Sequence, residues 1–340
     1  MHLSKDVVEP AVVVGIFTAG ALASRRRGRA RLYPKKADVD AEDGHVSRGD
    51  TPAKPPLHLL ARFWTKFPFL EEIWYWLLTV YQLLRALSAR MIAGDQAVFD
   101  TARRHALQVL HLESLLHIDV ERSFQEAILT RHAWLVPFLA QIYYAHISVG
   151  VCFLAYSYTY CPRDAYVRVR RTLALDNAVA FVVLTLWRCS PPRLLPAEYG
   201  FVDVLHGGMA SMPGAGAGDA PGVGGSAWTN NRFQLTIAAM PSLHFGTSLL
   251  LGLWLSRYSP HPAVRVLALL WPAAMLPTIV ATANHFVTDA FVGALIPCFG
   301  WRYAHLLARL APLQDRLFRP VRVAIGLEAE YHDGKGNTLD

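Results

Sequence analysis

Long hydrophobic runs separated by polar segments dominate the chain between residues 73 and 306. Six of them are candidate membrane-spanning helices, because they are mostly apolar and carry few charges. They cover Ile73–Leu87, Trp134–Tyr156, Leu173–Trp187, Leu243–Leu255, Val266–Ala281 and Phe286–Leu306. Backbone groups in a bilayer must be hydrogen-bonded within the protein, and no run alternates as a barrel strand does. The pattern therefore predicts an all-α fold, a polytopic bundle of about six transmembrane helices.

Residues 97–131 have a different pattern, because their apolar positions recur at helical spacing among many charges. Val109, Leu112 and Leu116, for example, lie between Arg104 and Glu121. Such a segment predicts an amphipathic helix or a pair of helices, which lie on the membrane surface or pack on the bundle.

The chain begins with a short apolar stretch, residues 11–23, which is followed by five arginines between positions 25 and 31. A secretory signal carries its positive charge before the apolar region, and the stretch is short for a membrane span. We therefore expect residues 1–24 to form an uncleaved membrane anchor or a membrane-dipping segment, in addition to the six spans. Residues 25–57 are polar and charged, as in a flexible linker.

The remaining chain divides into a membrane domain and a tail. We expect the membrane domain to cover residues 58–308 and to include a glycine-rich, low-complexity loop at 207–225. Residues 309–340 are first basic and then polar, which predicts a cytoplasmic tail.

Composition supports a membrane protein, since 53% of the residues are hydrophobic and only 17% are charged. Soluble domains carry about a quarter charged residues. The net charge of +7 does not indicate a nucleic-acid partner, because the basic residues cluster at the ends of the hydrophobic runs. They follow the second, fourth and sixth runs: Arg163, Arg168, Arg170, Arg171, Arg257, Arg265, Arg309, Arg316, Arg319 and Arg322.

The positive-inside rule places these arginines in the cytoplasm and the long loop 188–242 in the lumen or outside the cell. We expect an integral membrane protein of the Golgi, the endoplasmic reticulum or the plasma membrane. Three polar groups then share the lumenal face, each at the mouth of a run. They are Pro191-Pro192-Arg193, Met240-Pro241-Ser242-Leu243-His244 and Asn284-His285-Phe286-Val287-Thr288-Asp289.

The third group contains a histidine and a carboxylate at a spacing that has chemical meaning. His285 and Asp289 are four residues apart, so on a helix they lie one turn apart on one face. The carboxylate would accept the Nδ1 proton and direct Nε2 outward as a nucleophile toward phosphorus. His244 would act as general acid and base, Arg193 would bind phosphate oxygens, and the N-terminal ends of two runs would add positive dipole.

Taken singly, each of these residues is better explained by solvation at the membrane interface or by anchoring of a helix end than by a catalytic role. Interface solvation does not explain Asp289 well, because an unpaired carboxylate inside an apolar segment is energetically costly. Pairing with His285 would offset that cost. His146, inside the second run, is either functional or a neutral imidazole hydrogen-bonded between helices. The four cysteines have no metal-ligand spacing, and we expect no metal site.

These motifs resemble a known family. MPSLH at 240–244 and ATANHFVTDAFVGA at 281–294 resemble the second and third signatures of the type-2 phosphatidic acid phosphatase superfamily. CSPPRLLPAEYGFVDVLH at 189–206 resembles the first signature of its branch of inositol-phosphorylceramide synthases and related inositolphosphotransferases. The resemblance extends from about residue 70 to residue 306 and also includes LESLLHIDVERSFQ at 112–125 and IYYAHISVG at 142–150.

The resemblance implies a membrane enzyme that acts on lipid substrates through a phosphohistidine at His285, without a metal or another cofactor. It implies that Asp289 orients His285, that His244 is the general acid and base, and that Arg193 contacts phosphate. Ser242, in the second signature, is a further expected substrate contact.

Departures from the family pattern change the expected reaction. Leu243 replaces the glycine before the second-signature histidine, and Ile279 replaces an arginine six residues before His285. Losing an oxyanion-binding arginine should weaken binding of a highly charged phosphomonoester. This favours transfer of an inositol-phosphate-like headgroup between lipids. A lipid phosphate or isoprenyl diphosphate phosphatase and a non-catalytic lipid-binding protein are the alternatives.

Overall fold

The computed structural model describes residues 15–16, 73–205, 235–325, 332–333 and 337–338. The expected N-terminal membrane segment (1–24), apart from two helical residues at 15–16, lies outside the described residues. The expected linker (25–57) and glycine-rich loop (207–225) lie outside them as well.

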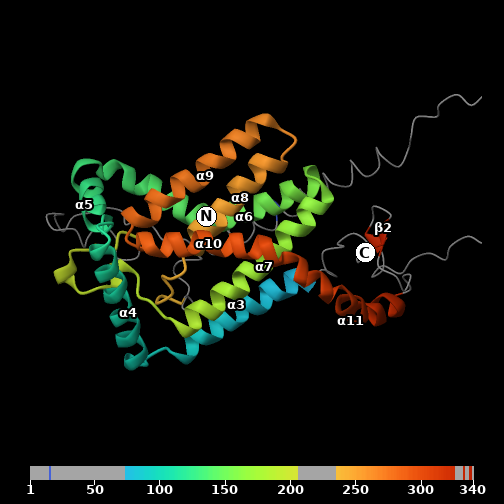
Figure 1. Cartoon of the computed structure of the whole chain (residues 1–340), viewed down its shortest axis with the longest axis horizontal. Helices are drawn as coiled ribbons and strands as arrows, with labels where there is room; N and C mark the ends of the chain where they lie inside the picture. Colours follow the sequence, from blue (N-terminus) through green and yellow to red (C-terminus); the bar gives the residue numbers. More distant parts are fainter. Residues whose placement is uncertain (1–14, 17–72, 206–234, 326–331, 334–336, 339–340) are drawn as a thin grey trace, which may run out of the picture.

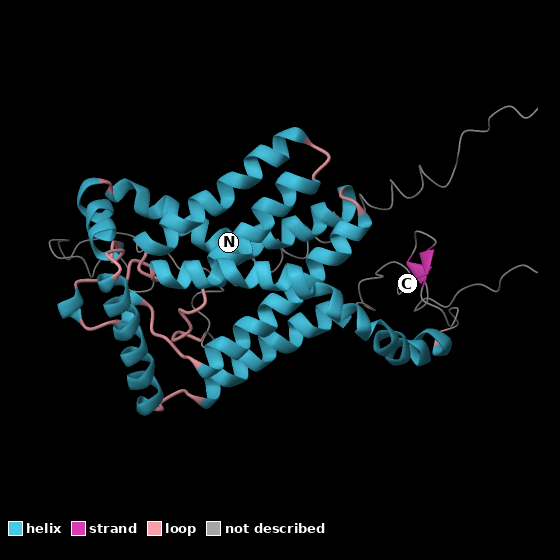
Figure 2. Ribbon diagram, viewed as in Figure 1, coloured by secondary structure: helices cyan, strands magenta, loops and turns pink. Residues whose placement is uncertain are grey.

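Helices make up most of the described chain (Figure 2), so the predicted all-α class is confirmed. The long helices are α3 (Ile73–Met91), α4 (Gln96–Leu115), α5 (Glu121–Arg131), α6 (Val136–Tyr160), α7 (Arg163–Leu186), α8 (Leu243–Tyr258), α9 (Pro262–Ala281), α10 (Val287–Tyr303) and α11 (Ala311–Ala324). Short 3-10 helices are η2 (Ala133–Leu135), η3 (Pro192–Leu194), η4 (Ala197–Tyr199) and η6 (Ala304–Leu310), and β1 (His332–Asp333) pairs antiparallel with β2 (Asn337–Thr338).

The bundle is built around α8, which packs against both α9 and α10. On one side, α6 packs on α9; on the other, α7 packs on α10 and on α3. The amphipathic segment forms the pair α4 and α5, which lies across one end of the bundle, at the left in Figure 1. Most connecting loops gather at that end in Figure 2.

The expectation of six spans is not supported by helix length and hydropathy. Among the described residues, two helical segments are long and apolar enough to cross a membrane, residues 133–160 (η2 with α6) and α9. The α8 and α10 helices have only 16 and 17 residues. The expected arginine-rich loop before the third run is mostly helical, because α7 already begins at Arg163 and so contains these charges.

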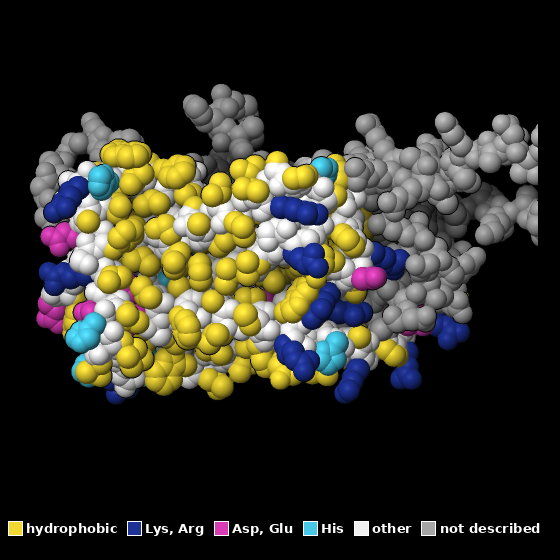
Figure 3. Space-filling model, turned by 45° about the horizontal axis from the view of Figure 1, so that its top comes forward, with side chains coloured by type: hydrophobic (Ala, Val, Ile, Leu, Met, Phe, Trp, Pro, Cys, Tyr) yellow, Lys and Arg dark blue, Asp and Glu magenta, His cyan; other side chains and the backbone are white. Residues whose placement is uncertain are grey.

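The surface separates apolar and basic side chains. Figure 3 shows hydrophobic side chains over the broad middle of one face, with most of its basic side chains toward the end nearest α11. Exposed arginines include Arg168 at the start of α7, Arg257 at the end of α8 and Arg302 at the end of α10. Residues 309–324 of the tail are helical and include α11.

A close crossing of α8 and α10 brings the second and third motifs together. A Cβ atom added to Gly246 would overlap the carbonyl of Gly293, and one added to Gly293 would overlap the carbonyl of Ser242. The amide of Ser242 also donates to the carbonyl of Asp289 over 3.0 Å. Glycine is required at both positions because it lets the two backbones touch.

Candidate active site

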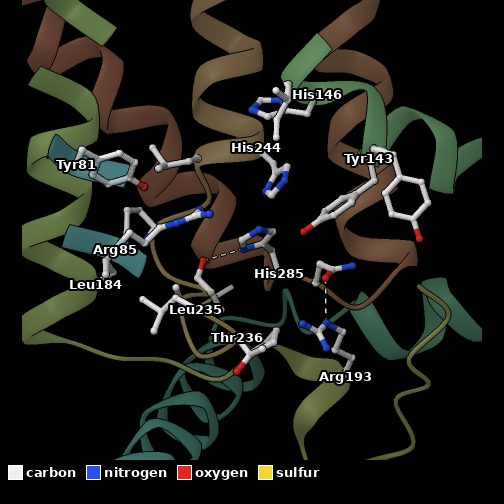
Figure 4. Close-up of a pocket in the computed structure, with 18 residues that line it drawn as sticks. Tyr81, Arg85, Tyr143, His146, Leu184, Arg193, Leu235, Thr236, His244 and His285 are labelled. Atoms are coloured by element: carbon white, nitrogen blue, oxygen red, sulfur yellow. Dashed lines mark hydrogen bonds between the residues drawn. The ribbon is translucent and has the colours of Figure 1, made fainter. Parts of the chain in front are cut away.

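A pocket with a cavity volume of about 160 Å³ lies where α8 and α10 begin, next to the end of α7 and beside the middle of α3 (Figure 4). This volume accommodates a phosphate group and a few further atoms. Its polar lining comes from six separate parts of the chain: Tyr81 and Arg85 of α3, Tyr143, Tyr144 and His146 of α6, Arg193 of η3, Thr236, His244 of α8, and Asn284 and His285 before α10.

His285 is held in a defined tautomer, but by a different group from the one predicted. Its Nδ1 lies 2.7 Å from the carbonyl oxygen of Ala239, the interaction drawn as a dashed line in Figure 4. A carbonyl can only accept a hydrogen bond, so Nδ1 carries a proton, and in the neutral ring the lone pair is on Nε2. The His285 side chain is only 6% exposed, which holds the ring in place.

Asp289 lies near His285 without forming the predicted hydrogen bond. Its Oδ2 is 3.6 Å from His285 Nδ1 and accepts instead from the backbone amide of Phe286 over 2.9 Å. The reason is that His285 precedes α10, whereas the prediction required both residues on one helical face. The carboxylate can still stabilise positive charge on the imidazole through space.

The turn that carries His285 is fixed by its own hydrogen bonds. Asn284 donates from its backbone amide to the carbonyl of Ile279 over 3.0 Å and from Nδ2 to Thr282 Oγ1 over 2.9 Å. Ala283 adopts a left-handed conformation, with φ of 50°. Such a conformation is costly for a residue with a Cβ, and this local strain lies directly beside the candidate nucleophile.

His244 lies in the first turn of α8, facing His285. The centroids of the two rings are 5.7 Å apart, close enough for one phosphoryl group to contact both. Tyr143 stacks on His244 with 4.3 Å between centroids, and His146 lies 4.8 Å from it on the same wall. The structure thus places His146 in the pocket, next to the predicted acid and base.

Arg193 lines the pocket but is already engaged. Its Nε donates to Asn284 Oδ1 and its Nη1 pairs with Asp203 Oδ2, each over 3.0 Å. Its backbone amide donates to the carbonyl of Ala283, also over 3.0 Å. Arg193 therefore braces the turn before His285, in addition to bordering the cavity.

Ser242 has a structural position. It is fully buried, it is the N-cap of α8, and its Oγ accepts from the amide of Phe245 over 3.3 Å. It is not among the residues that line the pocket, so the predicted substrate contact is not supported by its placement.

Three carboxylates surround the beginning of α10, and only one of them, Asp289, was predicted from the sequence. Asp289 accepts from the amide of Phe286, Glu121 of α5 from that of Val287 over 2.7 Å, and Glu113 of α4 from that of Thr288 over 2.6 Å. Both glutamates are buried. Their signal in the sequence was an acidic residue on the apolar face of an amphipathic helix.

This arrangement corrects the expected role of the α10 N-terminus. Its first free amides are taken by carboxylates, so they are not available to bind phosphate. Burial, and then the hydrogen bond with Glu121, raises the pKa of the Glu113 carboxyl to about 8. Glu113 therefore holds a proton at neutral pH, which reduces the repulsion in this group of acids.

Comparison with known proteins places the site in a family. The model of the PAP2 superfamily matches residues 107–302, more than half of the chain, and this range includes both pocket histidines and Asp289. No curated protein and no solved structure matched the chain. The two histidines around one pocket agree with the phosphatase and phosphotransferase chemistry of this superfamily. The chain belongs to the PAP2 superfamily and is a phosphatase or phosphotransferase of that family.

Proposed function

We propose that the protein is an integral membrane lipid phosphotransferase that moves an inositol-phosphate-like headgroup between lipids through a phosphohistidine. The observation that carries the proposal is the His285–His244 pair in one pocket. In the neutral imidazole, the hydrogen bond from Nδ1 to the Ala239 carbonyl places the lone pair on Nε2 of His285, as a nucleophile requires.

The first half-reaction forms the covalent intermediate. Nε2 of His285 attacks the donor phosphorus, the bond to the departing lipid alcohol breaks, and His244 gives that oxygen a proton. The positive charge that develops on the imidazole is balanced by the Ala239 carbonyl and by Asp289, 3.6 Å from Nδ1. In the second half-reaction His244 takes the proton of an acceptor hydroxyl, which attacks phosphorus and releases His285.

The pocket walls support a lipid substrate. Beside the histidines they contain aromatic and aliphatic side chains, including Tyr81, Tyr143, Ile147, Leu184 and Leu235. A wall of this kind accommodates the glycerol or sphingoid portion next to a phosphate.

Transfer is favoured over monoester hydrolysis by the residue at position 279. The family signature has an arginine there, whereas Ile279 is fully buried in the hydrophobic core with Met275. Without the arginine, the site has less positive charge to bind a dianionic phosphomonoester. A phosphodiester carries one negative charge less and therefore needs less positive charge around it.

We propose further that α3 and α6–α10 cross the membrane together, despite the short lengths of α8 and α10. The exposed arginines at the ends of α8 and α10 opposite the pocket support a cytoplasmic location for those ends. The active site would then open toward the lumen or the cell exterior, in the endomembrane system or the plasma membrane.

Headgroup exchange by the purified full chain in detergent micelles tests the proposal. With short-chain phosphatidylinositol as donor and short-chain ceramide as acceptor, we expect product that requires ceramide. We expect His285→Ala to abolish it and His305→Gln, which changes an exposed histidine after α10, to leave it unchanged. Equal exchange by wild type and His285→Ala would contradict the proposal.

A second donor separates transfer from hydrolysis. If dioctanoyl phosphatidate releases inorganic phosphate in a His285-dependent reaction without any lipid acceptor, the protein is a phosphatase. Such a result would overturn the transferase assignment and would leave the histidine chemistry in place.

A further inference from the structure

Phosphoryl transfer requires positive charge beside the non-bridging oxygens of phosphate, where negative charge must be held through the transition state. Three groups that were expected to supply this positive charge are missing or already paired in this protein. Ile279 occupies the family arginine position, carboxylates take the first amides of α10, and Arg193 is paired with Asp203. The pocket therefore needs another cation.

Arg85 is the second arginine that lines the pocket. It lies on α3 and its side chain enters the cavity from the wall opposite Tyr143, as Figure 4 shows. Its positive charge acts on both His244 and Tyr143. Within the described parts of the chain Arg85 has no carboxylate partner, in contrast to Arg193.

The fold directs Arg85 inward. Tyr81, Arg85 and Ala89 are spaced by four residues and so share one face of α3. Tyr81 and Ala89 are buried, whereas Leu83 and Leu87 on other faces are exposed. The hydroxyl of Tyr81 lies close enough to Arg85 for the two side chains to interact electrostatically.

Contacts with α7 and the following loop hold this face in place. Tyr81 packs edge-on against Phe181, with 6.1 Å between ring centroids, and Ala89 belongs to a core cluster with Leu184. At the end of α7, Arg188 Nη2 donates to Ser88 Oγ over 3.2 Å. Arg85 is thus positioned by packing on both sides of it along α3.

From this placement we propose that Arg85 binds the non-bridging oxygens of the phosphate group that His285 attacks. The planar guanidinium can donate two parallel hydrogen bonds to phosphate, and it lies on the wall of the cavity that holds both histidines. The inference rests on the proposed function. It adds a substrate-binding residue from a helix that the family match, which begins at residue 107, does not include.

Binding of inorganic phosphate tests the inference without turnover. The full chain in detergent is heated with increasing phosphate, and the shift of the unfolding midpoint gives the affinity. We expect Arg85→Gln to weaken phosphate binding by about tenfold or more, because charge-assisted hydrogen bonds are lost. Arg90→Gln changes an exposed arginine of the same helix and should bind phosphate as wild type does. Equal affinity in Arg85→Gln and Arg90→Gln would overturn the inference.

Kinetics in the exchange assay give a second readout. Arg85→Gln should lower kcat/KM by a similar factor and retain residual, His285-dependent activity. The kcat/KM of Arg85→Lys should lie between those of Arg85→Gln and wild type. If Arg85→Gln does not fold, Arg85→Lys carries the test, and wild-type phosphate affinity and kcat/KM in that variant would overturn the inference. If wild type matches His285→Ala in exchange, it is the proposed function that fails. If wild type is active and Arg85→Gln is equally active, only the proposed role of Arg85 is refuted.

Discussion

The tautomer and the charge of the His285 imidazole depend on two different neighbours. The Ala239 carbonyl fixes the tautomer of His285 through a direct hydrogen bond, whereas Asp289 contributes charge from 3.6 Å. Asp289 also caps α10 through the amide of Phe286. The two tasks of Asp289 can be separated by substitution, because asparagine retains a hydrogen-bond acceptor and loses the charge.

We expect Asp289→Asn to lower kcat by about one to two orders of magnitude with little change in stability, because only the charge near the developing imidazolium is lost. Asp289→Ala should lose the helix cap as well, at an additional cost of about 1 kcal/mol. Exchange kinetics and thermal unfolding of the two variants provide the measurements. A kcat of Asp289→Asn equal to that of wild type would show that the carboxylate acts only as a cap.

The residues of the site could be predicted from sequence more readily than their contacts. Polar side chains at the ends of apolar runs identified His244, His285 and Asp289, because charged groups in such places need a partner or a task. The acceptor for Nδ1 could not be predicted, because it is a main-chain carbonyl 46 residues away in sequence. Arg85 has a signal in the sequence as well, because it is an arginine inside an otherwise apolar run.

At the scale of elements, the beginning of α10 is the most heavily constrained point. Glu113 and Glu121 reach it from α4 and α5, and Gln125 Nε2 donates to the carbonyl of Ala281 at the end of α9 over 3.0 Å. The helix pair across the end of the bundle therefore fixes the position of the segment between α9 and α10, which carries His285.

Glu113 should make stability depend on pH. Its pKa is raised to about 8 in the folded protein from an ordinary 4.5, so the folded state holds a proton that the unfolded state releases. The contribution of Glu113 to stability is therefore greatest below pH 4.5 and falls as the pH rises toward 8. We expect the unfolding midpoint of wild type to drop by several degrees across this window and that of Glu113→Gln to stay nearly constant.

Glutamine reproduces the protonated carboxyl, since its oxygen can accept from Thr288 and its amide can donate to Glu121. Glu113→Ala leaves the Thr288 amide without this acceptor and should cost about 1–3 kcal/mol at every pH. A wild-type midpoint that rises between pH 4.5 and pH 8 would contradict the raised pKa.

Helical periodicity in the sequence predicted the existence of these elements better than their ends. The amphipathic segment was expected to be one helix or two, and the structure has the pair α4 and α5. The start of α7 was missed because its first turns, with Arg168, Arg170 and Arg171, look like a loop when charge alone is considered. Hydrophobicity indicates where a helix meets lipid, whereas backbone hydrogen bonds determine where the helix ends.

At the scale of the whole molecule, the pocket and most of the exposed arginines at helix ends occupy opposite ends of the bundle. If all six helices cross a membrane, Glu198 in η4 and His261 between α8 and α9 lie on different sides of it. We expect an impermeant maleimide to label Glu198→Cys from the lumenal or external side and His261→Cys only after permeabilisation. The background chain should have its four cysteines replaced by serine or alanine. Labelling of both positions from one side would rule out this topology.

The location of Arg85 on α3 divides the pocket between two parts of the chain with different constraints. The histidines and the three acids lie within the range that the family shares, and α3 precedes it. If Arg85 binds the phosphate as proposed, changes in α3 can alter which substrates the enzyme accepts while the two histidines and the three acids stay unchanged. Substrate selectivity in such an enzyme can evolve through substitutions in one wall of the cavity, without changes to the catalytic residues.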